Sequence, residues 1–566
     1  MDYVEAVNQK KSDWGALFSR MDNDRKLVEL DKYVLKDVND NIIPNSISVT
    51  LNDPAVFATN VESSLGGSTE QVIVESDSKD VDTHYIEDAV RASLSAANSR
   101  LVRQGRFPLN PYIDQQMCRR GRGAARCLFR LDKKTGELIP DIVPWDTHFV
   151  YYGMGADGLS WAAYETTRSK DMIEAEYPKL KIDEKEAIVL DVWDKVHNEV
   201  WIAGEKVVEK KHSYGYTPVV VQLVPMGSML ADKDSLACQG ESIFFLIRDL
   251  IPELNRLVSI IQSLNQKALD NALLWKSLSG IEATPPEYDK LTQPGSVTSA
   301  DLQGGAFPVD FGELKRHAYL LHTMIETRIQ RGSLSNLDLG VMGNQPWSAV
   351  SLIEIGEGRD QVFMPRLGAR GLLNQQLGEM LIDQIINSGV SSVEIGTRGH
   401  KRKFDAKKLT GEYEILFKYF IKSPKIDVAR FSMAAAAGNL IPDKAKRRDI
   451  LQREDPEEDE RQLRWEEAER LSPSVKMNRT IKSLMELSKK GDKDAAFEAE
   501  LLSTEMGVSL KSMLAGDVTQ LPKPGGPEKP EQLLPMFGKA GTGAAPSAKK
   551  AAGLEATPRG EERGED

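Results

Sequence analysis

The sequence predicts an α+β protein built around two long helices that flank a strand-rich segment. Residues 241–273 and 313–331 carry apolar side chains every three or four positions, as amphipathic helices do. The segment between them is poor in helix formers and is broken by Pro285-Pro286 and Gly304-Gly305, so short strands and turns are expected there. Residues 1–238 mix helical and strand patterns, which completes the α+β prediction.

The first long helix is expected to run about 50 Å at 1.5 Å per residue. Pro252 should bend it, because proline lacks an N–H and clashes with the preceding turn. Short strands are expected at residues 275–280, 295–299 and 306–311. These features predict two helices that carry a small β-rich tip.

The polar stretch from Ser333 to Val350 contains glycine and has no regular period, so it is expected to be a loop. A further long helical pattern follows and is broken by Pro365 and by several glycines, which predicts a kinked helix.

The N-terminal region is expected to be helical over residues 1–40, with a short strand at 47–53 and a new helix starting at Asp53-Pro54. A later helix should end at Gly105, before a hairpin whose turn is residues 133–136. Beyond the kinked helix, residues 413–420 alternate as a strand, and helices follow. From Ala515 the composition predicts disorder.

Composition narrows the functional classes. The chain has 566 residues, 40% of them hydrophobic and 28% charged, as in a globular protein of several domains. No apolar run is long enough for a membrane span. Three scattered cysteines argue against disulfides and a zinc pattern. A net charge of −12 argues against tight nucleic-acid binding, because such binding depends on Lys and Arg that neutralise phosphates.

Motifs of catalysis are weak or missing. Gly153–Gly158 fits G-x-G-x-x-G, but a strand-like stretch follows it where a dinucleotide site needs a helix, so a hairpin turn is expected. Neither a P-loop nor a G-x-S-x-G elbow occurs. The acidic run Glu454–Glu460 is interpreted as a solvated helix start rather than a metal site. No metal, cofactor or catalytic residue is expected.

Two further features have alternative interpretations. The basic cluster of Arg119, Arg120, Arg122 and Arg126 could contact nucleic acid, but pairing with acidic residues of a neighbouring subunit is favoured because no aromatic residues are interleaved. Trp347 could anchor the base of its loop to an adjacent helix or lie on a wall that meets DNA, and the anchor is favoured.

The order helix, strand-rich tip, helix, irregular loop and kinked helix resembles the portal proteins of tailed double-stranded DNA bacteriophages. There these pieces are stem, clip, stem, tunnel loop and tunnel helix. The helix-to-hairpin unit at residues 118–152 and the segment at residues 434–469, with its Asp-Pro-Glu-Glu run, are similar to wing and crown segments of the same family. The resemblance covers roughly residues 1–470.

The resemblance implies a portal-like division of the α+β chain. The expected parts are an α/β wing body (1–238), a first stem helix (239–270), a clip (271–311), a second stem helix (312–331), a tunnel loop (332–348), a kinked tunnel helix (349–390), a wing return strand (391–430), crown helices (431–514) and a disordered tail (515–566).

The resemblance implies that the chain is a structural protein and not an enzyme. Twelve copies would form a homo-oligomeric ring at one vertex of the capsid. The ring would pass double-stranded DNA during packaging and ejection. Its expected partners are the terminase large subunit, then the head-to-tail connector or adaptor protein, together with the major capsid and scaffolding proteins. The protein would be made in the host cytoplasm and reside in the virion, with no membrane association.

The resemblance also suggests two groups of site residues. Expected along the DNA channel, in the tunnel loop, are Asn336, Asp338, Asn344, Gln345 and Trp347. Expected at subunit or partner contacts, in the clip, are Trp275, Lys276, Leu278, Val297, Phe307 and Phe311.

Two other classes stay open. One is a different structural virion or tail protein with a helical body. The other is a subunit of a nucleic-acid enzyme, which the missing nucleotide, carboxylate and metal motifs disfavour.

Overall fold

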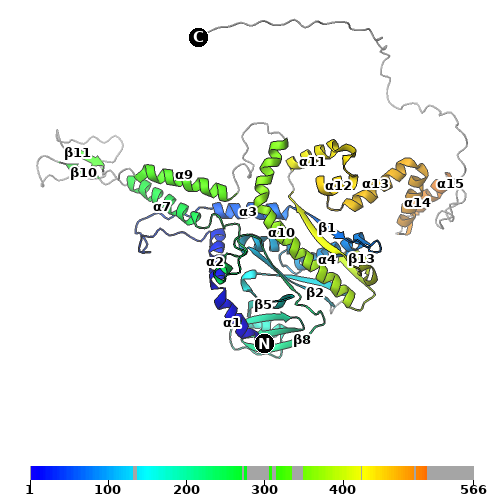
Figure 1. Cartoon of the computed structure of the whole chain (residues 1–566), viewed down its shortest axis with the longest axis horizontal. Coiled ribbons are helices and arrows are strands. Elements are labelled where there is room, and N and C mark those ends of the chain that lie inside the picture. Colours follow the sequence, from blue (N-terminus) through cyan, green and yellow to red (C-terminus); the bar gives the residue numbers. More distant parts are fainter. Residues whose placement is uncertain are drawn as a thin grey trace, which may run out of the picture. The chain divides into compact units, whose positions relative to one another are not determined.

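The computed structural model describes residues 2–131, 137–269, 273–276, 305–308, 314–333, 349–421, 424–489 and 493–505. The fold is α+β, as predicted, and the chain divides into two compact units, Met1–Arg461 and Gln462–Asp566 (Figure 1). The main helices are α1 (Tyr3–Asp13), α2 (Gly15–Glu29), α3 (Asp53–Gly66), α4 (Thr83–Arg103), α5 (Leu109–Arg119), α6 (Lys170–Glu176), α7 (Leu250–Leu269), α9 (Leu314–Gly332), α10 (Ala349–Asn387), α11 (Pro424–Ala436), α13 (Pro456–Leu471), α14 (Pro473–Lys489) and α15 (Lys493–Glu505).

Within the described part of the chain, the strands form five small antiparallel sheets, in the orders β4-β5-β6-β7-β8, β3-β2-β9, β1-β14, β12-β13 and β10-β11. Their bounds are β1 (Thr69–Glu75), β2 (Arg122–Leu131), β3 (Leu138–Trp145), β4 (Val150–Gly155), β5 (Gly158–Ser169), β6 (Glu186–Asp194), β7 (His197–Ile202), β8 (Glu205–Lys211), β9 (Val219–Leu223), β10 (Leu273–Lys276), β11 (Gly305–Pro308), β12 (Ser392–Thr397), β13 (His400–Asp405) and β14 (Glu414–Phe420).

Several predicted elements are confirmed. The hairpin β2–β3, the helix that ends before Gly105 and the strand at residues 414–420 lie where the patterns placed them. The G-x-G-x-x-G stretch is the β4–β5 turn, with Gly155 paired to Gly158 and no helix following. A dinucleotide site of the strand-turn-helix type is therefore excluded there. Sequence reasoning did not find β1, which pairs with β14 more than 300 residues away.

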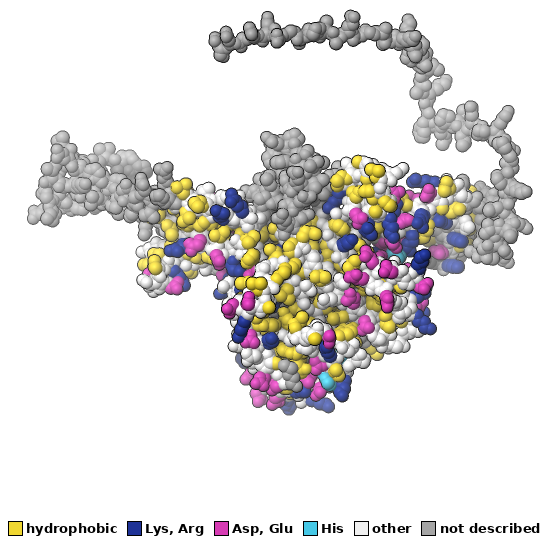
Figure 2. Space-filling view, viewed as in Figure 1, with side chains coloured by type: hydrophobic (Ala, Val, Ile, Leu, Met, Phe, Trp, Pro, Cys, Tyr) yellow, Lys and Arg dark blue, Asp and Glu magenta, His cyan; other side chains and the backbone are white. Residues whose placement is uncertain are grey.

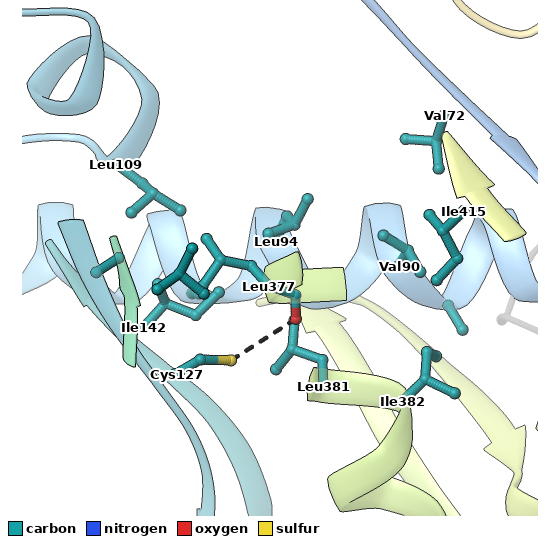
Figure 3. Packing of buried hydrophobic residues seen from close by; sticks show 14 of the residues in the cluster. Val72, Val90, Leu94, Leu109, Cys127, Ile142, Leu377, Leu381, Ile382 and Ile415 are labelled. Atoms are coloured by element: carbon teal, nitrogen blue, oxygen red, sulfur yellow. Dashed lines mark hydrogen bonds between the residues drawn. The ribbon is translucent and has the colours of Figure 1, made fainter. Parts of the chain in front are cut away.

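The largest core lies where α4 and the C-terminal half of α10 meet the inner faces of β2 and β14. Figure 3 shows Leu377, Leu381 and Ile382 of α10 among side chains from these elements. The buried Cys127 Sγ of β2 lies 3.7 Å from the Leu377 carbonyl oxygen. Burial raises the pKa of the Cys127 thiol, so this cysteine behaves as a small apolar residue. The core fixes α10 to the N-terminal body.

The prediction for residues 1–53 is partly wrong. Helix α2 ends at Glu29, because Leu30 adopts a left-handed conformation with φ 56°, and residues 31–52 are not helical. The expected strand at 47–53 belongs to none of the described sheets, and Asp53 already begins α3. Its backbone N–H groups donate to side chains of α7 instead, which a strand pattern cannot reveal.

The expected bend at Pro252 is also wrong. Helix α7 begins at Leu250, so Pro252 lies in the first turn, where its missing N–H has no intrahelical partner to lose. Residues 241–249 were predicted to be helical, but residues 243–249 form turns and 241–242 have no regular structure. The first long helix is therefore shorter than the sequence pattern suggested.

Helix α10 is a single helix of 39 residues with Pro365 inside it. Figure 1 shows that it changes direction along its length. A proline within a helix removes one backbone hydrogen bond and introduces a steric clash, which accounts for a bend.

The second unit is helical over its described part. Helices α14 and α15 pack together, with Ile481, Ala495 and Ala499 buried between them. Helices were predicted for this region. The predicted disordered tail from Ala515 lies outside the described residues. None of the described helices is both long enough and apolar enough to span a membrane.

Candidate functional site at the α7–α9 pair

Helices α7 and α9 lie side by side and share one core with α3 (Figure 1). Ile251 and Leu254 of α7 and Ile329 of α9 are buried in this core. Between the three helices lies a cleft of about 210 Å³. Where α9 ends, a Cβ on Gly332 would lie 2.7 Å from Ile247 Cγ2, so this close approach requires glycine. The α7–α9 pair is thus packed tightly at its base, by which we mean the start of α7 and the end of α9.

A buried charge network anchors the chain just before α7. Arg248 donates to both oxygens of Asp24 (2.6 and 3.0 Å) and to Glu241 Oε2 (2.7 Å). Both carboxylates are almost fully buried. Burial lowers the pKa of Arg248, but the hydrogen bonds to Asp24 and Glu241 outweigh it, so the net pKa is raised. The guanidinium therefore ties α7 to α2.

A second close contact fixes the same base. Gly121 has φ +73°, and a Cβ there would lie 1.8 Å from the Gly240 carbonyl oxygen. Arg20 donates to the carbonyl oxygens of Ala237 and Gly240 (2.7 and 2.9 Å). Only glycine permits this approach of two backbones.

Paired strands lie at the far ends of the two helices. β10 follows α7, β11 precedes α9, and they pair antiparallel with Trp275 opposite Ala306 and Leu274 opposite Phe307. Trp275 and Lys276 are thus in β10 and Phe307 is in β11, as the strand prediction had it. Their predicted role at subunit contacts stays a prediction.

The other predicted site residues fall outside the described part of the chain. In the expected clip these are Leu278, Val297 and Phe311. In the expected tunnel loop they are Asn336, Asp338, Asn344, Gln345 and Trp347. Their roles, including both interpretations of Trp347, remain predictions.

The interior face of α10 carries buried arginines that sequence reasoning did not single out. Arg370 pairs with Asp114 of α5 (2.5 Å), donates to Ser68 Oγ (2.6 Å) and lies 4.0 Å over the Tyr419 ring. Burial lowers the pKa of Arg370, but the Asp114 carboxylate, together with Tyr419 and Glu70, outweighs burial, so the net pKa is raised. The periodic pattern of apolar residues cannot reveal this ion pair, because Asp114 lies 256 positions from Arg370 in the sequence.

The basic cluster at residues 119–126 is paired within the chain, and the favoured pairing with a neighbouring subunit is not needed. Arg119 pairs with Glu62 (2.7 Å), Arg120 with Asp146 (3.7 Å) and Arg126 with Asp141 and Asp191 (both 3.3 Å). Arg122 is buried and donates to the Gln239 carbonyl oxygen (3.2 Å). The alternative, that these arginines contact nucleic acid, is disfavoured for the same reason: their side chains already have partners within the chain.

Histidine and carboxylate groups do gather at one place in the first unit. His84 lies within 3.6 Å of Glu87, Asp88 and Glu457. Arg91 pairs with Glu87 (3.3 Å) and with Asp455, so cationic side chains already neutralise the carboxylates. The predicted acidic helix start is found at α13, and Asp455 caps it by accepting from the Glu458 N–H (3.0 Å). The arrangement is an ion-pair cluster between α4 and α13.

No protein-family model matches the sequence, and no curated protein matches it either. Among solved structures, the chain is similar to a chain from the neck of an empty GTA particle computed with C6 symmetry. That match has a TM-score of 0.38 and 12% identity, and covers 69% of this chain and 88% of the other. A second match, to the neck of a native GTA particle computed with C12 symmetry, has a TM-score of 0.31 and 12% identity, and covers 64% and 88%.

Proposed function

We propose that this chain is the subunit of a portal ring, a structural component of a tailed bacteriophage head. The observation that carries the proposal is the α7–α9 pair: two packed helices rooted in the α+β body, with paired strands β10 and β11 at their far ends. The bent helix α10 follows in the order that the portal architecture requires. An elongated pair of this kind suits neighbouring copies packed around an axis.

In this function the chain forms a ring of twelve copies at one vertex of the capsid, beside the major capsid and scaffolding proteins. Double-stranded DNA passes along the axis during packaging and ejection. The strand-bearing tip binds the terminase large subunit and afterwards the head-to-tail connector or adaptor protein. The chain supplies positions and contacts, and the energy for DNA movement comes from the terminase.

The composition of the chain supports a channel without strong DNA binding. The net charge of −12 disfavours tight phosphate contacts, which would have to be broken at every step of translocation. The arginines at residues 119–126 are engaged in ion pairs and carbonyl contacts of the body. Sliding DNA is compatible with both features.

The test is the mass and appearance of the purified full-length protein. Native mass spectrometry should give an assembly of about a dozen subunits, and negative-stain images down the symmetry axis should show a ring with a central hole. A monomer that cleaves or copies DNA would refute the proposal in favour of an enzyme subunit. A ring that fails to support DNA uptake into proheads would favour another virion or tail protein.

A further inference from the structure

Residues 31–52, named the arm here, lie along α7 through a regular set of hydrogen bonds. The backbone N–H groups of Ile47, Val49 and Leu51 donate to Ser263 Oγ (2.9 Å), Ser259 Oγ (2.8 Å) and Asn255 Oδ1 (3.0 Å). Two residues of extended chain span about 6.6 Å, and four residues of helix rise about 6 Å. Every second arm residue therefore meets every fourth residue of α7.

The arm is also folded back on itself. Tyr33 and Leu35 donate their backbone N–H groups to Thr50 Oγ1 (2.9 Å) and Ser48 Oγ (3.0 Å). Its tip is a turn in which the Asp37 carboxylate accepts from the N–H groups of Asn39 (2.8 Å) and Asn41 (2.9 Å). The tip is thus ordered by its own hydrogen bonds.

This ordered tip exposes apolar side chains. Val38 is 94% exposed and Ile42 is 67% exposed, while Leu35 is buried. The ordered turn thus presents two exposed aliphatic side chains at one place, where a neighbouring molecule can reach them.

Helix α9 presents a second bare apolar surface. Ile325 and Ile329 pack toward α7 and α3, whereas Leu320 and Met324, one turn apart, are 57% and 61% exposed. Tyr319 beside them is 58% exposed. Figure 2 shows hydrophobic side chains on the surface over α9. We name Tyr319, Leu320 and Met324 the α9 face.

The arm and the α9 face lie on different sides of α7. The arm contacts α7 through Asn255 and Ser259, and α9 packs against the side that carries Leu254 and Val258. Consecutive helix residues differ by about 100° in direction. Figure 1 shows residues 31–52 along α7 opposite α9. Each copy therefore offers two different apolar surfaces on two sides of one helix.

We infer that the arm of one copy covers the α9 face of the neighbouring copy. Two different surfaces of one chain that bind each other make a head-to-tail contact, which closes into a ring when the rotation permits. Charge also matches: the arm has three Asp and two Lys, and α9 has four Lys or Arg and one Glu. The inference rests on the proposed ring and assigns its subunit contact.

Cross-linking tests the contact directly in the full-length chain. Cys238 is the exposed native thiol among the described residues, so Cys238→Ser provides the background. In this background, Val38→Cys combined with Leu320→Cys and a short bis-maleimide should give a ladder of covalent multimers up to the closed ring. Mixing the two single variants should give dimers only, because each copy then carries one half of the contact.

The matched control pairs Val38→Cys with Ile188→Cys, at an exposed position of β6 in the body. It should give no ladder. Rings of the Val38→Cys, Leu320→Cys double variant that are seen by negative stain but form no cross-link would overturn the inference and leave the proposed function standing. A wild-type chain that forms no assembly would contradict both.

A second measurement uses surface charge. Met324→Glu and Val38→Asp should each raise the protein concentration needed for half-maximal assembly at least tenfold, with unchanged thermal melting of the monomer. Met154→Glu, at another exposed methionine, in β4, should change this concentration less than twofold. If Met324→Glu leaves assembly unchanged but abolishes binding of another virion protein, the α9 face belongs to that partner and the inference fails.

Discussion

Arg248 and Asp24 form a bidentate ion pair across 224 residues of sequence, with the Asp24 carboxylate completely buried. Glu241 accepts a third hydrogen bond from the same guanidinium (2.7 Å). Arg20 Nη1 also lies 3.4 Å from Glu241 Oε1, so two arginines neutralise two carboxylates that are out of contact with water, and Arg248 is the one that contacts both. The position of α7 on the body depends on this arrangement.

Replacing Arg248 by Ala should destabilise the first unit strongly. It leaves Asp24 and Glu241 with one fewer cation, and breaking one side of a buried pair costs about 3–5 kcal/mol. Thermal or denaturant unfolding measures the effect. Arg256→Ala is the matched control, because Arg256 is exposed and its contact with Glu253 is 3.9 Å, so a change of at most about 1 kcal/mol is expected. Equal effects of the two substitutions would refute the role of the network.

Replacing Ser259 by Ala should loosen the arm. The Val49 N–H loses its acceptor; a fully buried unsatisfied donor costs about 1–3 kcal/mol, and because this one is only partly buried the low end of that range is expected. Hydrogen exchange should rise at Val49 and its neighbours before the helices are affected. Thr59→Ala, which removes a hydroxyl bonded only to the carbonyl oxygen one turn earlier in α3, serves as the control. Unchanged protection of Val49 would show that the arm does not depend on α7.

The ion-pair cluster at His84 should make stability depend on pH. A hydrogen bond with Glu87 raises the pKa of His84, burial opposes it, and Asp88 raises it further. Because the pKa of His84 is higher in the folded than in the unfolded chain, protonated His84 stabilises the fold. This stabilisation is complete when the pH is below the unfolded-state pKa near 6.5, and it is lost as the pH rises through the folded-state pKa. Melting temperatures between pH 6 and pH 9 should therefore fall more for wild type than for His84→Gln. His400→Gln controls for the loss of a histidine as such, and identical slopes for wild type and His84→Gln would contradict the assignment.

The loop predicted at residues 333–348 allows a test of the DNA channel that rests on the proposed function. Asp338 and Asn344 offer no cation to phosphate, so replacing both by Arg should add attraction and slow or stall DNA uptake into proheads, while rings still form. Uptake is measured at two salt concentrations, and Asp157→Arg on the exposed β4–β5 turn is the control. Normal uptake at low salt, where attraction is strongest, would remove this loop from the channel wall.

The sequence by itself determined the local elements and their order. Hydrophobic period, turn residues and proline positions were sufficient for α4, the β2–β3 and β4–β5 hairpins, α9 and the long helix around Pro365, because these signals act within one or two turns of chain. The α+β class follows from the same signals. The candidate site was predicted from the order of these elements. Trp275, Lys276 and Phe307 lie in the strands expected for them, and their role at subunit contacts stays a prediction.

Only the tertiary structure decided which distant segments pair and which polar groups they satisfy in each other. Pairing of β1 with β14, the Arg248–Asp24 ion pair and the side-chain bonds that hold residues 47–51 on α7 each join segments at least 200 residues apart. The helix expected over residues 241–249 and the strand expected at 47–53 were wrong for this reason. Their backbone and side-chain polar groups form hydrogen bonds with distant parts of the fold. Burial strengthens these hydrogen bonds, so they outweigh the intrinsic helix or strand preference of the local sequence.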